Sequence, residues 1–344
     1  MNRGDDTMNT AARIYRLLVP AATVLTLCVV VLGAWVRLTD AGLGCPDWPG
    51  CYGTLTVPKT AAQMDYAAGA FPERPVDHGK AWREMIHRYF AGALGLMIFA
   101  IAAAAWANRR DPAQPVRLPL ALAGVIVAQA LLGMWTVTLL LKPFIVTLHL
   151  LGGLTTLGLL FWLTLGVFRA GPAGAMTRVP RRLRTLALAG LVLLGVQITL
   201  GGWTSTNYAA LACPDFPTCQ TQWWPEMDFA EGFRPWHGLG IDYEGGILDS
   251  PARTAIHYVH RIGALVVTVV LGGLAVAALG GGRPPALRRA GAFLLGALAV
   301  QLAIGIGIIH YSLPLSLATA HNAGAALLLL ALLNYYHLVR HAEH

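Results

Sequence analysis

Charged side chains are scarce in this chain of 344 residues, because aspartate, glutamate, lysine and arginine together make up only 12% of it. A soluble domain carries about 25% charged residues, so the composition excludes an ordinary soluble enzyme. The hydrophobic share of 56% also excludes an intrinsically disordered chain, which is poor in large apolar side chains and rich in charge. The composition is instead typical of a protein embedded in a lipid bilayer.

Eight apolar stretches are each long enough to cross the hydrocarbon core as a helix of about 20 residues. They are residues 16–37, 86–107, 118–140, 145–168, 184–204, 255–279, 287–310 and 315–339. The sequence therefore predicts an all-α membrane protein with eight transmembrane helices. An even number of spans places both termini on the same side of the membrane.

The distribution of charge predicts which side that is. The two termini and the loops at 108–117, 169–184 and 281–289 hold 15 of the 25 lysines and arginines but only 4 of the 17 acids. By the positive-inside rule, both termini are predicted to be cytoplasmic, with the long loops 38–85 and 205–254 outside. The net charge of +8 is then a consequence of topology, so no nucleic-acid partner is predicted.

Cysteine is rare as well, with five residues in the chain. Cys28 lies in the first span and is expected to be a small buried hydrophobic residue. The others form two pairs in the predicted outer loops, Cys45 with Cys51 and Cys213 with Cys219. On the oxidising side of a bacterial membrane, a disulfide in each pair is the simplest interpretation. A zinc site made of four thiolates is the alternative, which the six-residue spacing disfavours.

The sequence contains an internal repeat. Residues 33–51, GAWVRLTDAGLGCPDWPGC, align without a gap with residues 201–219, GGWTSTNYAALACPDFPTC, and IHRYFAGAL at 86–94 resembles VHRIGAL at 259–265. The chain is therefore predicted to consist of two tandem four-helix bundles, residues 1–175 and 176–344. Halves with four spans each are parallel repeats, expected to be related by a pseudo-two-fold axis along the membrane normal.

Four histidines lie within the predicted spans, where polar residues are costly and are functional candidates. Each half has one on its second span and one on its fourth, namely His87 with His149 and His260 with His321. Two imidazoles on facing helices can bind a haem iron axially. The alternative is that the four are interior histidines hydrogen-bonded to carbonyl groups. Copper or zinc sites would need more ligands than two.

Arginines adjoin these sites at the outer ends of the spans, where the positive-inside rule does not place them. Arg88 and Arg261 directly follow two of the histidines, and Arg37 ends the first span. These three are candidates to bind haem propionates, because arginine forms bidentate bonds with carboxylates. The alternative is that they extend to the membrane interface.

The two halves differ three residues before the first histidine of each pair. Glu84 precedes His87 on the same helix face, whereas His257 holds this position before His260. An acid beside one site predicts that this site performs chemistry and the other holds a permanent cofactor. Glu84 is the candidate acid–base or proton-relay group, and the alternative is a helix-start acid favoured by the helix dipole. The roles of His257 and His310 stay open.

Taken together, these motifs resemble those of the haem A synthase family, membrane enzymes that oxidise haem O to haem A for terminal oxidases. The resemblance rests on eight spans in tandem halves, one histidine pair per half, Glu84-x-x-His87-Arg88 and a cysteine pair in each large outer loop. It implies that His260 and His321 hold a resident haem b, that His87 and His149 bind the substrate haem O, and that Glu84 is the catalytic acid. It also implies that the cysteine pairs are extracytoplasmic disulfides.

The same resemblance implies the cellular context. The chain is expected in the bacterial inner membrane, with the cysteine loops facing the periplasm. Haem O synthase is the expected substrate donor, the assembly of a terminal oxidase the product acceptor, and an electron-transfer partner of unknown identity is required. Two other functions would use the same histidines, a dihaem b-type cytochrome that only passes electrons and a haem transporter.

Overall fold

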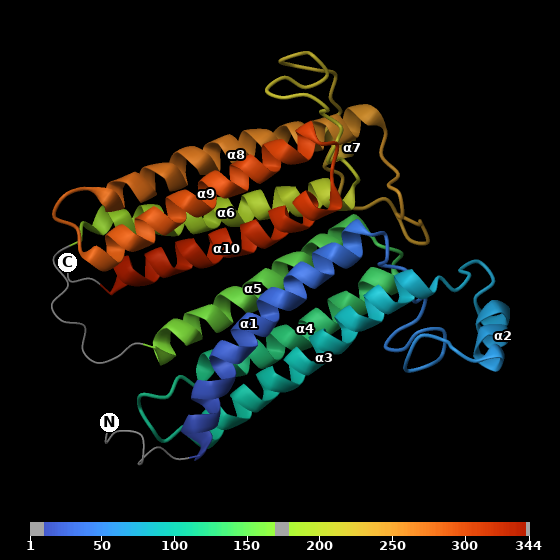
Figure 1. Ribbon diagram of the computed structural model, residues 1–344, viewed down its shortest axis with the longest axis horizontal. Helices are drawn as coiled ribbons and strands as arrows, with labels where there is room; N and C mark the ends of the chain where they lie inside the picture. Colours follow the sequence, from blue (N-terminus) through green and yellow to red (C-terminus); the bar gives the residue numbers. More distant parts are fainter. Residues whose placement is uncertain (1–9, 169–178, 342–344) are drawn as a thin grey trace.

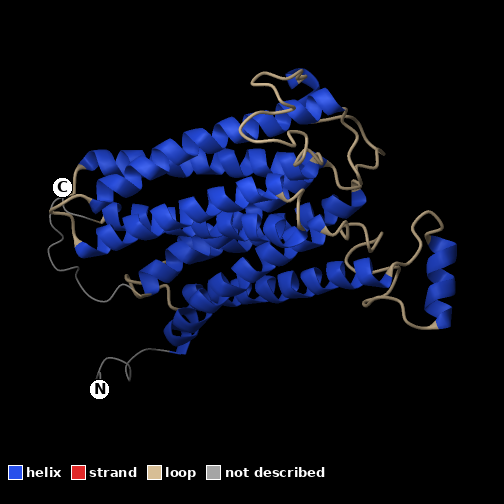
Figure 2. Cartoon of the chain, turned by 45° about the horizontal axis from the view of Figure 1, so that its top comes forward, coloured by secondary structure: helices blue, strands red, loops and turns tan. Residues whose placement is uncertain are grey.

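The computed structural model describes residues 10–168 and 179–341, and this part of the chain is almost entirely helical, without strands (Figures 1 and 2). Eight helices are long and apolar enough to cross a membrane. They are α1 (Thr10–Leu38), α3 (His78–Ala107), α4 (Arg117–Thr138), α5 (Pro143–Val167), α6 (Arg181–Thr206), α8 (Ser250–Leu279), α9 (Pro285–His310) and α10 (Leu315–Arg340). The prediction of an eight-span helical membrane protein is confirmed.

The eight helices form two groups of four. Helices α1, α3, α4 and α5 pack together, as do α6, α8, α9 and α10, and the groups meet where α5 contacts α6 and α10 and where α1 contacts α10 (Figure 1). Each group has its own apolar core. We call these groups the N-half and the C-half. The predicted boundary between residues 175 and 176 lies outside the described residues.

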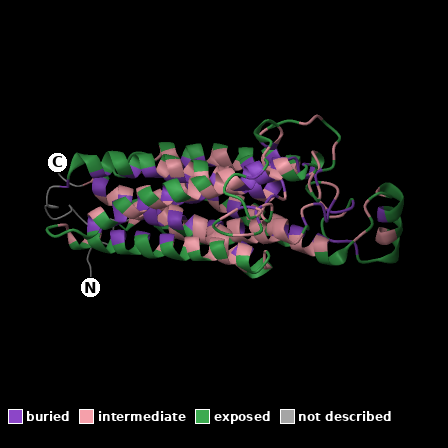
Figure 3. Cartoon of the chain, turned by 90° about the horizontal axis from the view of Figure 1, so that it is seen from above, coloured by how far each residue is buried: buried purple, intermediate pink, exposed green. Residues whose placement is uncertain are grey.

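Apolar side chains also cover the outer faces of the helices, where large exposed residues such as Leu96 and Val269 would face lipid (Figure 3). Cys28 lies on such a face of α1 and is exposed. The expectation that Cys28 is buried was therefore wrong. Hydrophobicity alone does not distinguish the core of a bundle from its lipid-facing surface, because both are apolar.

The second helix of each half begins in the same way. The Asp77 carboxylate accepts a hydrogen bond from the backbone N–H of Lys80 at the start of α3, and the Asp249 carboxylate accepts one from Ala252 at the start of α8. Both are standard N-caps. Helix α3 therefore begins eight residues before the apolar stretch predicted at 86, which places Glu84 inside the helix, almost two turns from its start.

The backbone repeats as closely as the sequence does. Left-handed φ angles occur at Asp40 and Tyr208, which are equivalent in the aligned segments, and again at Leu140 and Ser312. The cysteine loops also have the same internal bonds. The Asp47 carboxylate accepts the N–H groups of Tyr52 and Gly53, as Asp215 does for Gln220 and Thr221. These bonds, with one from the Thr218 hydroxyl as the largest contribution, hold the pKa of Asp215 below its usual value.

The two long loops lie at one end of the bundle, opposite the end where α1 begins and α10 ends (Figure 1). They include two short helices that the sequence did not predict, α2 (Ala61–Ala70) and α7 (Phe229–Gly232). Helix α2 begins with a capping box, in which Thr60 and Gln63 satisfy each other's backbone N–H groups. This helix is short and only weakly amphipathic, so a hydropathy pattern does not reveal it.

Ion pairs connect the two long loops. Arg74 of the first loop pairs with Asp242 and, at 2.6 Å, with Glu244 of the second loop, and the Lys80 ammonium lies 3.3 Å from Glu244. Partial burial would raise the pKa of Glu244, but hydrogen bonds from Arg74 and Lys80 outweigh it and lower the pKa. The backbone N–H of Tyr243 also donates to the Leu140 carbonyl of the N-half, at 3.1 Å. These ion pairs and this hydrogen bond therefore hold the long outer loop of the C-half against the N-half.

Both predicted disulfides are present, Cys45–Cys51 and Cys213–Cys219. Each closes a short loop, which gives a stabilisation of about 2 kcal/mol in the chain-entropy estimate. We expect that, in denatured protein, alkylation before reduction labels Cys28 alone, and that four more thiols react after reduction. Intact-mass analysis measures the number of labels. Free loop thiols before reduction, or bound zinc, would contradict this expectation.

Candidate haem sites

Each of the four intramembrane histidines lies against a glycine of a neighbouring helix. The pairs are His87 of α3 with Gly33 of α1, His149 of α5 with Gly133 of α4, His260 of α8 with Gly201 of α6, and His321 of α10 with Gly305 of α9. A Cβ atom at these glycines would lie 2.9, 3.3, 3.1 and 3.1 Å from the imidazole Cε1 atoms, respectively. An added Cβ atom would clash with the ring at Gly33 and would crowd it at the other three positions, so glycine lets the rings lie close to the neighbouring backbone.

The structure brings the histidines together in the predicted pairs. His87 and His149 are near enough to interact electrostatically, and so are His260 and His321. Helices α3 and α5 lie diagonally in the N-half, since in the described chain each contacts α1 while α3 and α5 make no direct packing contact, and α8 and α10 are arranged in the same way. Each pair therefore meets across the middle of a bundle, where four-helix proteins commonly bind cofactors.

The ring nitrogens fit a role as ligands. The Nδ1 atoms of His87, His149 and His321 are buried and have no hydrogen-bond partner, although buried polar atoms are normally satisfied. The alternative of histidines whose two nitrogens are satisfied by carbonyl groups therefore does not describe these three. Two imidazoles per half fit axial ligation of a haem iron. In residues 10–168 and 179–341, no group of three or more His, Cys, Asp or Glu residues is arranged to hold a bare metal ion.

Glu84 lies on α3 one helical turn before His87 and is only 5% exposed. Its Oε2 atom accepts a hydrogen bond of 2.8 Å from the backbone N–H of Cys45, and its Oε1 atom lies 2.5 Å from the guanidinium of Arg88. Glu84 therefore joins the disulfide loop to the histidine helix α3. It is not a helix-start acid, because Asp77 occupies that position.

His257 takes the place of Glu84 in the C-half. Its Nδ1 atom accepts a hydrogen bond of 3.2 Å from the backbone N–H of Cys213. Its Nε2 atom, which then carries the ring proton, lies 3.3 Å from the Arg261 guanidinium. The two halves therefore share one scaffold, in which a side chain three residues before the histidine holds the cysteine loop and an arginine. Only the N-half provides a carboxylate in that position.

The three arginines that were candidates for haem propionates all contact the protein itself. Arg88 donates to the carbonyls of Asp47 and Gly50, and Arg261 donates to those of Thr218 and Cys213, at 2.8 and 2.7 Å. Arg37 on α1 donates to the Ser205 carbonyl at the end of α6. These bonds reflect the folding of the loops, which the sequence could not reveal.

Arg37 lies at the contact between the halves. It donates a hydrogen bond of 2.8 Å to the Ser205 carbonyl, and its guanidinium lies 4.2 Å from the centre of the Tyr208 ring. It thereby links the end of α1 to the end of α6. Its guanidinium also forms an ion pair with Asp40, at 3.5 Å.

Three glutamines accompany the histidines. Gln129 and Gln301 precede His149 and His321 by twenty residues in the sequence, which makes them candidates to bond across helices or to a macrocycle, whereas Gln197 was not predicted. Gln129 lies against Gly152 of α5, and Gln301 against Gly324 of α10. Gln301 donates a hydrogen bond of 3.0 Å to the backbone carbonyl of His321. Gln197 of α6 contacts His260. A signal was available, because glutamine is polar and each of the three lies within an apolar span.

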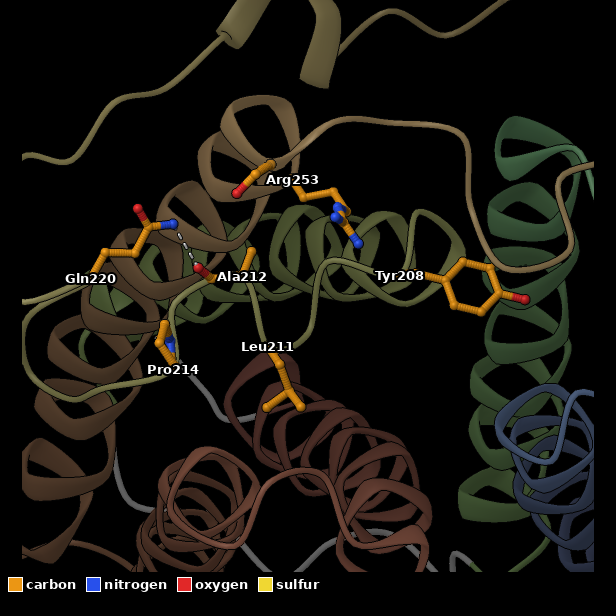
Figure 4. A pocket seen from close by; sticks show the side chains of 7 residues that line it. Tyr208, Leu211, Ala212, Pro214, Gln220 and Arg253 are labelled. Atoms are coloured by element: carbon orange, nitrogen blue, oxygen red, sulfur yellow. Dashed lines mark hydrogen bonds between the residues drawn. The ribbon is translucent and has the colours of Figure 1, made fainter.

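Two other features lie apart from the histidine pairs. A cavity of about 290 Å³ lies on the outer loops of the C-half, lined by Tyr208, Leu211, Ala212, Pro214, Gln220, Ser250 and Arg253 (Figure 4). None of the four histidines lines it. His310, the last residue of α9, is exposed and its ring stacks edge-on against Tyr311.

The fold defines a multi-pass helical membrane protein whose two halves each carry a pair of intramembrane histidines on equivalent helices. The sequence profile of COX15-CtaA, described as cytochrome oxidase assembly protein, matches residues 16–333. The chain belongs to this family.

Relatives that carry the name Heme A synthase match nearly the whole chain. The protein from Shewanella oneidensis is 43% identical over 91% of this chain and 93% of its own length. Those from Methylobacterium radiotolerans and Paracoccus denitrificans are 28% and 27% identical, covering 94% and 95% of this chain and 88% of their own lengths. The membership of the haem A synthase family that the sequence predicted is confirmed.

Proposed function

We propose that this protein is a haem A synthase, which oxidises one methyl group of haem O to a formyl group. The observation that carries the proposal is the pair of matched histidine sites in a chain 43% identical to a protein of that name. A dihaem cytochrome or a haem transporter would explain the histidines, but neither would explain why only one half places a carboxylate beside its pair.

We assign the sites by that difference. His87 and His149 of the N-half, residues 1–175, would bind the substrate haem O. His260 and His321 of the C-half, residues 176–344, would hold a resident haem b. The support is the buried Glu84 carboxylate beside the first pair and the imidazole of His257 at the equivalent place beside the second.

The reaction requires the removal of protons and electrons. Converting a methyl group and one water molecule into a formyl group releases four protons and four electrons, so an electron acceptor is needed in addition to this chain. The haem iron supplies the redox chemistry when it is bound. The histidines fix the position of the macrocycle, and the Glu84 carboxylate, held by Cys45 and Arg88, can accept a proton from the reacting group.

The context we propose follows the same assignment. The ends of the helices that carry the cysteine loops would face the periplasm of a bacterial inner membrane, as the charge distribution predicts. Haem O synthase would deliver the substrate, and the assembly of a terminal oxidase would receive the product. An electron-transfer partner of unidentified nature would complete the reaction.

Expression together with a haem O synthase, in cells that lack haem A, tests the proposed function. We expect the extracted haems to include haem A, one equivalent of haem b, and haem O or its hydroxylated form, separated by chromatography. Two equivalents of haem b without haem A would identify a dihaem cytochrome. Unmodified haem O alone would identify a carrier.

A further inference from the structure

Of the four intramembrane histidines, only His260 has a side chain bonded to its Nδ1 atom in the described structure. The amide Nε2 of Gln197 on α6 lies 3.1 Å from His260 Nδ1 and donates to the backbone carbonyl of the same residue at 3.0 Å. The other amide atom, Oε1 of Gln197, is buried without a partner. Gln197 therefore contacts both the ring and the backbone of one ligand candidate.

A glycine makes this contact possible. Gly263 lies three residues after His260, and a Cβ atom there would come within 2.2 Å of Gln197 Oε1. Any larger residue at position 263 would displace the amide from its place beside the ring. Gln197 and Gly263 therefore act as a unit, one providing the hydrogen bond and the other the space for it.

His87, the equivalent histidine of the N-half, lacks both parts of this unit. Gln197 lies four residues before Gly201, and the equivalent position, four residues before Gly33, is Val29. Phe90 follows His87 by three residues, as Gly263 follows His260. The other histidine of each pair has a glutamine twenty residues ahead of it in both halves, Gln129 or Gln301. Each of these amides lies against a glycine three residues after the histidine, Gly152 or Gly324. The Gln301 amide also lies 3.4 Å from His321 Nε2, on the ring nitrogen opposite to the one that Gln197 contacts in His260.

A partner on the second ring nitrogen determines how firmly a histidine holds a metal. Such a partner fixes the tautomer and orientation of the ring, and it makes the ligand more basic when it accepts the N–H proton. Rotation of the Gln197 amide exchanges its two ends, so that Oε1 can accept the Nδ1 proton when iron occupies Nε2. This rotation replaces the bond from Gln197 Nε2 to the His260 carbonyl. His87 has no such partner, and its ring is held by packing alone.

We infer that Gln197 is a positioning residue that makes the C-half a site of permanent haem retention. This inference rests on the proposed function. Val29 and Phe90 leave the equivalent histidine of the N-half without this bond, so that a substrate haem can enter and the product can leave. The two halves thus share one scaffold, and the bond from Gln197 to the Nδ1 atom of His260 distinguishes the site of the retained cofactor from that of the exchanged substrate.

Gln197→Leu in the full-length purified protein tests the inference. We expect haem b to transfer to excess apomyoglobin about 10- to 100-fold faster than from the unaltered protein, as is typical when a partner of a metal-bound histidine is removed. The midpoint potential of haem b should also shift upward, because the ring becomes a weaker electron donor. Gln197→Glu, which keeps an acceptor, should restore slow transfer. An unchanged transfer rate and potential in Gln197→Leu would overturn the inference.

Two further variants keep the test decisive. Gln129→Leu removes a glutamine at a similar depth in the N-half and should leave the transfer rate and potential of haem b unaltered. If Gln197→Leu does not fold, Gly263→Ala displaces the amide without deleting a polar group and should accelerate haem b transfer in the same way. If Gly263→Ala retains haem b normally, the inference fails.

The complementary experiment introduces the glutamine and the glycine into the N-half. Val29→Gln combined with Phe90→Gly supplies both missing parts, and haem O should then leave the purified protein more slowly. Unaltered haem O release would show that this bond does not separate the halves. These measurements use haem retention and potential, so they remain informative if the unaltered protein forms no haem A, a result that would refute only the proposed function.

Discussion

Glu84→Gln is expected to lower haem A formation by about 10²–10⁴-fold, the range typical for loss of a positioned acid–base group. The glutamine carbonyl can still accept the Cys45 N–H, and Arg88 keeps its bonds to the carbonyls of Asp47 and Gly50. The fold, the haem b in the C-half and the binding of haem O should therefore persist. Hydroxylated haem is expected to accumulate. Chromatography of the extracted haems measures each species.

Two controls accompany this variant. The spectrum of haem b reports on folding in the same sample. Glu231→Gln removes an outer-loop carboxylate whose partners are His237 and Arg234, and haem A formation should be unaffected. If Glu84→Gln forms haem A at the unaltered rate, Glu84 only fastens the cysteine loop to α3. If it loses haem b instead, the two halves have been assigned in reverse.

His260→Ala or His321→Ala is expected to abolish the low-spin haem b spectrum. Each substitution removes one of the two proposed axial ligands of the C-half. A cofactor that binds only the folded state stabilises it by mass action, about 2.7 kcal/mol when present at 100 times its dissociation constant. Both variants should therefore also unfold at a lower temperature. Absorption spectroscopy and thermal unfolding in detergent measure the two effects.

Two control variants distinguish the loss of a haem ligand from a general loss of folding. His87→Ala removes the equivalent residue of the N-half and should retain haem b. His310→Ala removes an exposed ring at the end of α9 and should behave as the unaltered protein. Full haem b with a bis-histidine spectrum in both His260→Ala and His321→Ala would show that the C-half assignment is wrong.

The features that depend on local sequence were predictable. Hydropathy is a local property, so the eight spans agree with helices α1, α3–α6 and α8–α10, and only their ends moved. Helix α3 begins at His78 rather than 86 because Asp77 caps it, and such a cap depends on one side chain and not on apolar periodicity. The short helix α2 and the exposure of Cys28 were missed because neither alters the hydropathy pattern.

The contacts of the candidate site depended on tertiary structure. The sequence identified His87, His149, His260, His321 and Glu84 as candidates because polar residues are rare in these spans. The sequence did not indicate that Arg88 and Arg261 would bond to loop carbonyls, because these bonds join segments about forty residues apart. The assignment of the two halves to substrate and cofactor stays a prediction.

The sequence by itself determined the number of spans, the duplication, the disulfide pairs and the positions of the four histidines, because each follows from local hydrophobicity or from residue spacing. The tertiary structure decided which helix lies against which. It placed the rings of the four intramembrane histidines against glycines of other helices, joined Glu84 to the Cys45 backbone, and set Gln197 beside His260. These contacts join different helices, and side-chain packing determines them. Hydrophobic periodicity describes one helix at a time, so it does not reveal which side chains meet between helices.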